Sequence, residues 1–160
     1  MKKFKKAAML LVMVTISAIS FNCSSSDSSD DNNNNSSTFY LKCKVNGTLV
    51  EFTDPMVLNS LAKSITGNDA DTGEAVTLFT PLAVGMGTFA ITDEPSNENS
   101  YGGGYNNFND DIYSDNETGT MTITEVNADV IKGTFSFTGD DGNGGTVTVT
   151  EGSFRAENIQ

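Results

Sequence analysis

The chain has no histidine and no tryptophan among its 160 residues. Without histidine there is no Ser-His-Asp or Cys-His pair for nucleophilic catalysis, and no imidazole to bind a metal. Acidic residues alone can support glycoside hydrolysis, but no motif selects one pair from the 18 carboxylates after residue 37. The sequence therefore predicts a protein that is not an enzyme and needs no cofactor.

Cysteine is scarce, with only Cys23 and Cys43 in the chain. Two cysteines cannot supply the disulfide framework of a small secreted fold. Cys43 alternates with Leu41 and Val45 on the apolar side of an expected strand, whereas its two neighbouring lysines point the other way. We therefore expect a buried, unreactive thiol at position 43.

Basic residues are few after residue 22, where five of them stand against 21 acidic residues, a net charge of −16. A surface of this charge repels nucleic acid and anionic lipid headgroups, so we expect no nucleic-acid partner. An attraction for cations is one functional interpretation. The simpler one is that the charge keeps a secreted domain soluble and monomeric.

The first 22 residues have the pattern of a lipoprotein signal peptide. Four lysines precede an apolar run over residues 7–21. Its length suits a signal-peptide core of ~7–15 residues better than a membrane span of ~20. Cys23 follows at once and resembles the lipid-bearing cysteine of bacterial lipoproteins. Ser20 and Asn22 depart from the usual Leu and small residue at those positions. Ordinary cleavage after Ser20 is the alternative, and it would allow a Cys23–Cys43 disulfide.

Residues 24–37 contain only Ser, Asp and Asn, which cannot offset the entropy of ordering. The chain thus divides into a signal peptide (1–22), a lipidated Cys23 with a flexible tether (23–37) and one domain (38–160). A short acidic tract after the cysteine resembles the export signal of surface-displayed lipoproteins in some Gram-negative lineages. We expect a protein anchored in the outer membrane by the lipid at Cys23 and displayed at the cell surface.

The domain has the pattern of an antiparallel β-sandwich or barrel-like meander. Gly-Thr followed by an apolar residue recurs five times, as if a turn glycine were opening a strand each time. Asn46-Gly47 predicts a type I′ hairpin between residues 39–45 and 48–53. Three consecutive strands follow residue 120, with a bulge at Gly152 that returns Phe154 to the core face. The expected core is Leu41, Cys43, Val45, Phe89, Ile91, Met121, Ile123, Phe135, Phe137, Val147 and Val149.

The segment 54–65 fits two structures. Asp54 and Pro55 suit the start of a helix, and Leu58, Leu61 and Ile65 have helical spacing. The alternation around Lys63, which runs into a Gly-Asn-Asp turn, suits a strand. Because hairpins surround this segment, we predict a strand.

Four motifs together resemble an uncharacterised group of small secreted all-β lipoproteins. The resemblance covers about residues 39–155 and implies an all-β domain with no known activity or catalytic residues. Its motifs are Lys44-Val45-Asn46-Gly47, Gly87-Thr88-Phe89, Gly133-Thr134-Phe135-Ser136-Phe137 and Val149-Thr150-Glu151-Gly152-Ser153-Phe154.

Three segments concentrate carboxylates and amides: 69–74, 106–111 and 140–143. Asp69, Asp71 and Glu74 place oxygen atoms at intervals that suggest calcium, but their glycine and glutamate do not fit an EF-hand. Turn chemistry alone explains Asp, Asn and Gly between strands. These residues are weak calcium candidates, and we expect no metal.

The best candidate binding site is the aromatic segment 101–113, with Tyr101, Tyr105, Phe108 and Tyr113. Its glycines at 102–104 suggest a mobile loop, in which exposed rings would stack on a glycan while amides bind its hydroxyls. The alternative is a short strand at Ile112-Tyr113 with Phe108 folded inward. The sequence thus predicts a surface module that binds glycan or another exposed ligand, or a structural lipoprotein with no small-molecule site.

Overall fold

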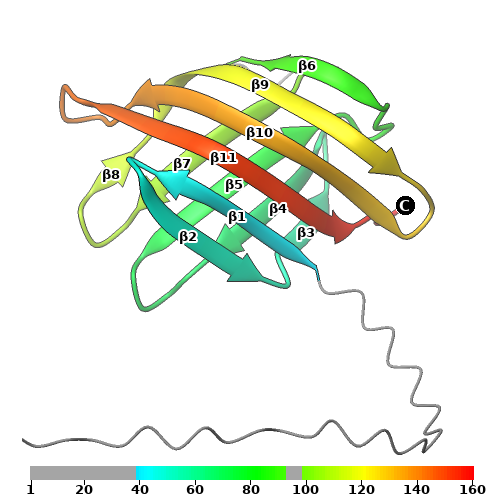
Figure 1. Cartoon of the computed structure of the whole chain (residues 1–160), viewed down its shortest axis with the longest axis horizontal. Coiled ribbons are helices and arrows are strands. Elements are labelled where there is room, and N and C mark those ends of the chain that lie inside the picture. The colour runs from blue at the N-terminus through cyan, green and yellow to red at the C-terminus, as the bar shows by residue number, and fades with distance from the viewer. Residues whose placement is uncertain (1–38, 93–98) are drawn as a thin grey trace, which may run out of the picture. The chain divides into compact units, whose positions relative to one another are not determined.

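The computed structural model describes residues 39–92 and 99–160, so the predicted signal peptide, Cys23 and the tether lie outside it. Within these ranges the chain forms eleven β-strands, which pack as two antiparallel sheets (Figure 1). The predicted all-β, antiparallel sandwich is therefore confirmed. None of the described segments forms a helix long and apolar enough to cross a membrane.

The six-stranded sheet has the order β2-β1-β11-β10-β9-β6. Its strands are β1 (Tyr40–Val45), β2 (Thr48–Thr53), β6 (Gly87–Ile91), β9 (Asp115–Val126), β10 (Val130–Asp140) and β11 (Thr146–Glu157). The predicted hairpin joins β1 to β2, and Asn46 and Gly47 have φ values of 48° and 87°, as a type I′ turn requires. Because β1 also pairs with β11, the first and last strands lie side by side in the middle of this sheet.

The three strands β9, β10 and β11 form the predicted consecutive hairpins. Thr150 and Glu151 stand opposite the single residue Ser136, and Glu151 has a φ of 52°. This bulge lies just before Gly152, and it leaves Phe154 fully buried. The predicted return of Phe154 to the core is confirmed.

The five-stranded sheet has the order β3-β4-β5-β7-β8. Its strands are β3 (Met56–Asn59), β4 (Lys63–Asn68), β5 (Glu74–Thr80), β7 (Gly102–Asn107) and β8 (Ile112–Tyr113). The ambiguous segment 54–65 is extended, as predicted, although a turn at residues 60–62 divides it between β3 and β4. The helical alternative was wrong: the buried residues of segment 54–65 are Val57, Lys63 and Ile65, which lie at the alternating spacing of strands.

The core lies between the two sheets. The predicted core residues are buried, except Phe89, which is half-buried and packs against the core. The five-stranded sheet adds Ile65, Val76, Leu78 and Tyr105, which the sequence analysis did not place there. An isolated parallel bridge between Ile91 and Tyr101 links the two sheets on the side of β6.

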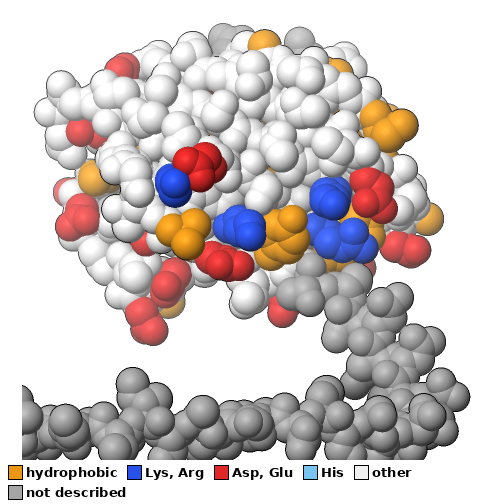
Figure 2. Space-filling view, viewed as in Figure 1, with side chains coloured by type: hydrophobic (Ala, Val, Ile, Leu, Met, Phe, Trp, Pro, Cys, Tyr) orange, Lys and Arg blue, Asp and Glu red, His pale blue; other side chains and the backbone are white. Residues whose placement is uncertain are grey.

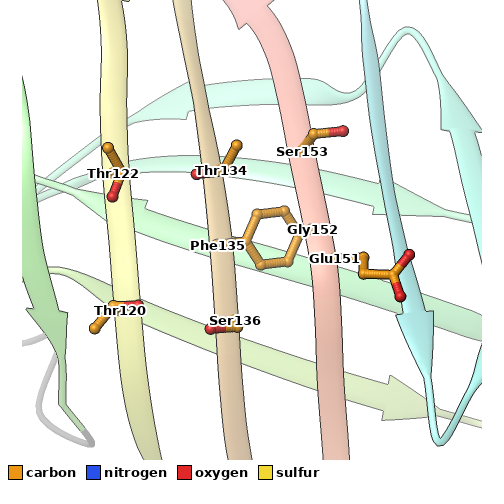
Figure 3. A pocket seen from close by; sticks show the side chains of 8 residues that line it. All are labelled: Thr120, Thr122, Thr134, Phe135, Ser136, Glu151, Gly152 and Ser153. Atoms are coloured by element: carbon orange, nitrogen blue, oxygen red, sulfur yellow. The ribbon is translucent and has the colours of Figure 1, made fainter.

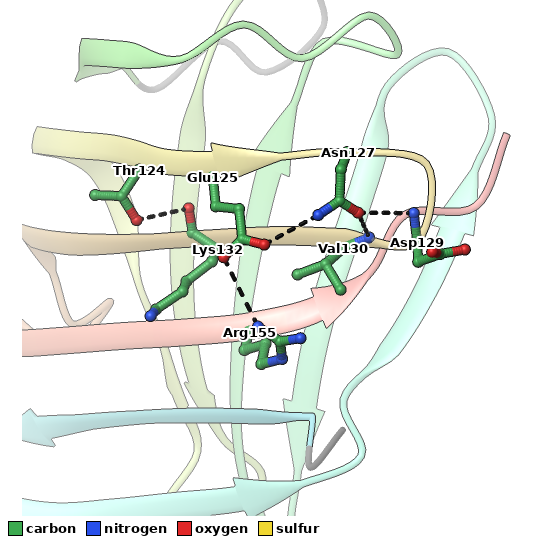
Figure 4. A network of polar contacts seen from close by, with 7 residues as sticks. All are labelled: Thr124, Glu125, Asn127, Asp129, Val130, Lys132 and Arg155. Carbon is green, nitrogen blue, oxygen red and sulfur yellow. Dashed lines mark hydrogen bonds and ion pairs between the residues drawn. The ribbon is translucent and has the colours of Figure 1, made fainter. Parts of the chain in front are cut away.

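Polar side chains fix the turn between β9 and β10 (Figure 4). The Asn127 side-chain oxygen accepts the backbone N–H groups of Asp129 and Val130, and its amide donates to Glu125. Glu125 also pairs with Arg155 of β11 at 3.8 Å. The turn is thus held by its own Asx geometry and tied to the next strand.

Charges are unevenly distributed over the described surface. Four basic residues, Lys42, Lys44, Lys132 and Arg155, occupy outward positions of the six-stranded sheet. Figure 2 shows this face, with the basic side chains in a band and a largely uncharged area beside it. The remaining base of the domain, Lys63, is buried with 1% of its surface exposed.

Candidate functional site

Three polar turns meet at one end of the sandwich, on the left in Figure 1. We call residues 69–73, 108–111 and 140–145 the turn cluster. The backbone N–H of Phe108 donates to the carbonyl of Gly73, and the Asn109 side chain donates to the carbonyl of Asp71. The Asn143 side chain reaches the carbonyl of Asp111. The fold therefore unites three segments that the sequence showed only as separate polar stretches.

Two aromatic side chains project from this cluster. Phe108 begins the β7–β8 turn and Tyr113 lies in β8, just after it. Their side chains are 60% and 47% exposed, and their rings meet edge to face with centroids 5.9 Å apart. Phe108 does not fold inward, whereas the short strand expected at Ile112-Tyr113 does form. This pair offers an exposed apolar surface within a polar surround.

The other two predicted binding residues, Tyr101 and Tyr105, lie in the core. Their exposed fractions are 6% and 4%. The Tyr101 ring stacks on Phe89, with centroids 4.0 Å apart. The Tyr105 hydroxyl donates to Glu74 at 3.0 Å, and burial together with this contact raises the pKa of Tyr105 to about 12. Neither ring presents a face to a ligand, so their assignment as exposed stacking residues was wrong.

The cause of this error is the run of glycines at 102–104. It forms strand β7, between β5 and β8, and not the mobile loop that was predicted. A Cβ atom at Gly103 would lie 2.9 Å from the ring of Phe137, so this glycine allows close packing across the core. The alternation of Tyr101, Gly103, Tyr105 and Asn107 is the signal that identifies the inward face.

The weak calcium candidates are engaged in local contacts. The Asp69 carboxylate accepts the backbone N–H groups of Asp71 at 2.8 Å and Thr72 at 3.4 Å, which closes an Asx turn. Glu74 accepts the hydroxyl of Tyr105. Within residues 39–92 and 99–160, no group of three or more His, Cys, Asp or Glu side chains is placed to hold a metal.

A partly buried polar network lies next to the aromatic pair. The backbone N–H of Tyr105 donates to the Ser114 hydroxyl at 2.7 Å, and that hydroxyl donates to Glu117 at 2.5 Å. Glu117 is only 7% exposed. These contacts fix Ser114 beside Tyr113 and join the start of β9 to β7. Hydrogen bonds therefore hold the backbone next to the exposed pair in place.

The model of a protein family, DUF6252, described as a domain of unknown function, matches residues 58–156. The match covers more than half of the chain. This chain belongs to the DUF6252 family. Searches of curated proteins and of solved structures gave no match.

The DUF6252 match includes the whole turn cluster with Phe108 and Tyr113. It begins within β3 and ends one residue before the end of β11, so the β1–β2 hairpin lies ahead of it. That hairpin nevertheless completes the six-stranded sheet by pairing with β11. The folded unit is thus larger than the segment that matches the family.

The DUF6252 domain also has a shallow groove of about 360 Å³ on the outer face of the six-stranded sheet (Figure 3). Hydroxyl side chains of Thr120, Thr122, Thr134, Ser136 and Ser153 line it, with Glu151 at its rim. The Phe135 ring points into the core and gives the groove no aromatic face. Threonine is favoured on any exposed strand surface, so this groove is the weaker candidate.

Proposed function

We propose that this protein is a lipoprotein held at the cell surface through Cys23, and that its DUF6252 domain binds an exposed glycan through Phe108 and Tyr113. The binding part of the proposal rests on the exposed aromatic pair. The anchoring part rests on the N-terminal sequence pattern, which the described residues do not include.

The chemistry of the pair suits a sugar. One face of a pyranose ring is apolar and stacks on an aromatic side chain, while its hydroxyls need hydrogen-bond partners at the edge. Phe108 and Tyr113 supply the ring surface, and Asn109, Asp111 and Asn143 supply amide and carboxylate groups beside it. A site of this kind binds a sugar without a catalytic residue, which fits the proposal of a binding protein.

A glycan array tests the proposal, with the chain from residue 24 onwards as a soluble probe. Phe108→Ala and Tyr113→Ala should each weaken binding about fivefold, because a stacking contact is worth ~1 kcal/mol. Leu49→Ala is the matched control, since Leu49 is also exposed, at 62%, but lies in β2. Binding that survives both aromatic changes would show that the site lies elsewhere.

A second candidate is a structural or interaction lipoprotein with no small-molecule site. The burial of Tyr101 and Tyr105 favours it, because it removes half of the aromatic surface that the sequence predicted. An array with no bound glycan, with and without calcium, would support this second function.

A further inference from the structure

The turn cluster is strongly acidic, and the basic residues that the structure describes form no ion pair with it. Seven aspartates lie in it or directly beside it: Asp69, Asp71, Asp110, Asp111, Asp115, Asp140 and Asp141. Within the part of the chain that the structure describes, the two ion pairs are Lys44–Glu151 and Arg155–Glu125. Neither includes any of these seven carboxylates.

Two of these carboxylates are placed where like charges repel. Asp115 of β9 and Asp140 of β10 are direct cross-strand partners, and one such pair of like charges destabilises a sheet. Asp111 sits at the tip of the β7–β8 turn, between Phe108 and Tyr113 in sequence, and has a φ of 59°. An incoming positive charge would therefore meet an unbalanced negative field at the aromatic pair.

Aromatic ring faces and carboxylates both attract positively charged ligands. A cation above an aromatic ring is attracted by the negative face of the ring, and the attraction grows when carboxylates lie nearby. An acidic sugar would meet repulsion from the same carboxylates. A neutral sugar would gain nothing from them beyond hydrogen bonds.

We propose that the ligand of the Phe108–Tyr113 pair is an amine-bearing glycan, a sugar polymer with free ammonium groups. This inference rests on the proposed glycan-binding function and names its substrate class. The rings stack on the sugar, and the aspartates of the turn cluster attract its ammonium groups.

Two oligosaccharides of equal length and linkage test the charge directly. Chitosan and chitin oligomers share one backbone and differ in whether the amine is free or acetylated. In a low-salt buffer that protonates the sugar amine, the chain from residue 24 should bind the chitosan oligomer about fivefold more tightly. The preference should shrink as salt is added, because the carboxylates are exposed and screened.

A matched pair of variants separates the local field from the net charge. Asp111→Asn should lower the preference for the free amine about threefold, as expected when one nearby exposed charge is lost. Asp54→Asn makes the same change at an exposed aspartate with a similar φ of 50°. Asp54 donates its N–H to Phe39 beside the start of β1, at the opposite end of the sandwich, and its change should leave the preference intact.

The outcomes distinguish this inference from the proposed function. Equal binding of the two oligomers, lost in Phe108→Ala, would overturn the amine preference and leave glycan binding in place. An equal effect of Asp54→Asn and Asp111→Asn would overturn it too, because net charge alone would then explain the preference. If an oligolysine of equal charge bound more tightly than chitosan, the partner would be a basic peptide and the glycan assignment would fall.

Discussion

The ammonium group of Lys63 donates a hydrogen bond to the side-chain oxygen of Asn158, 2.5 Å away, and both residues are buried. Lys63 and Asn158 are 1% and 8% exposed. The carbonyl of Ile159 accepts a second hydrogen bond from Lys63, at 2.7 Å. Asn158 also donates its backbone N–H to Asp129, so one residue joins the β9–β10 turn of one sheet to β4 of the other.

Loss of the Asn158 side chain should destabilise the protein. Asn158→Ala removes an acceptor from a buried amine, which should cost about 1–3 kcal/mol of unfolding free energy. In a Lys63→Met background the same change should cost less, because methionine needs no acceptor. Urea unfolding of the two single variants and the double variant measures the coupling. Additive effects would show that the contact contributes little.

The contribution of Lys63 to the free energy of unfolding should become more favourable as the pH rises. Burial lowers the pKa of Lys63 from 10.5 in the folded protein. Below the folded pKa the amine is charged in both states, and its burial penalty is fully present. Between the folded pKa and 10.5 the unfolded chain holds the extra proton, so the unfolding free energy rises with pH. Lys63→Met should lack this rise when the two proteins are compared by urea unfolding at several pH values.

Cys43 should show the opposite pH dependence. Burial and the charge of Glu74 raise the pKa of the Cys43 thiol from 9.0 to about 12. The unfolded chain releases this proton first, so stability should fall between pH 9.0 and about 12. Cys43→Val should reduce this fall in unfolding free energy. The buried tyrosines, whose pKa values are also raised, should account for the fall that remains. In the native chain from residue 24, a thiol reagent should react with Cys43 only after unfolding.

Alanine substitutions at the neighbouring glycines Gly103 and Gly104 of β7 should have different effects on stability. Gly103→Ala places a Cβ atom 2.9 Å from the buried ring of Phe137, and overpacking of this kind costs about 1–3 kcal/mol. At Gly104 the nearest atom, Oε1 of Glu117, is 3.7 Å from the new Cβ. Gly104→Ala should therefore be neutral or stabilise the fold by up to about 1 kcal/mol. Denaturant midpoints of both variants check this, and equal losses would contradict it.

The anchoring proposal predicts a mature N-terminus at a lipidated Cys23. Two or three acyl chains hold a protein firmly on a membrane, since each buried methylene contributes ~0.8 kcal/mol. Cys23→Ala should therefore move the protein from the membrane fraction to the soluble fraction. Mass spectrometry of the N-terminal peptide is the direct measurement. A soluble wild-type product that begins at Phe21 would contradict the anchor.

The sequence predicted those parts of the fold that depend on local patterns. Asn46-Gly47 specifies its own turn, and alternation over β9 to β11 specifies an inward face. The interpretation of every Gly-Thr pair as a turn glycine that opens a strand does not hold at all five positions. Gly119 and Gly133 lie inside long strands, where a Cβ atom would lie within 2.1 Å and 2.4 Å of the neighbouring strand's backbone. These glycines serve close strand contact, which a local pattern cannot distinguish from a turn.

The candidate site depended on contacts that are distant in sequence. Nothing local shows that residues 69–73 pack beside residues 108–111, or that Asn143 reaches Asp111. The positions of Tyr101 and Tyr105 depend in the same way on partners from β6 and β5. Lys63 is the clearest case, because the two oxygen atoms that accept its hydrogen bonds belong to residues about a hundred positions later in the chain.

The direction of β1 has a consequence for how the domain is presented. β1 runs from Tyr40 to Val45, and the next residue, Asn46, donates its N–H to the carbonyl of Thr148 near the β10–β11 turn. Its six residues span about 20 Å. On the proposed attachment through Cys23, the chain would enter the sandwich at Tyr40, at the end opposite Phe108 and Tyr113, and the aromatic pair would stay open to a ligand.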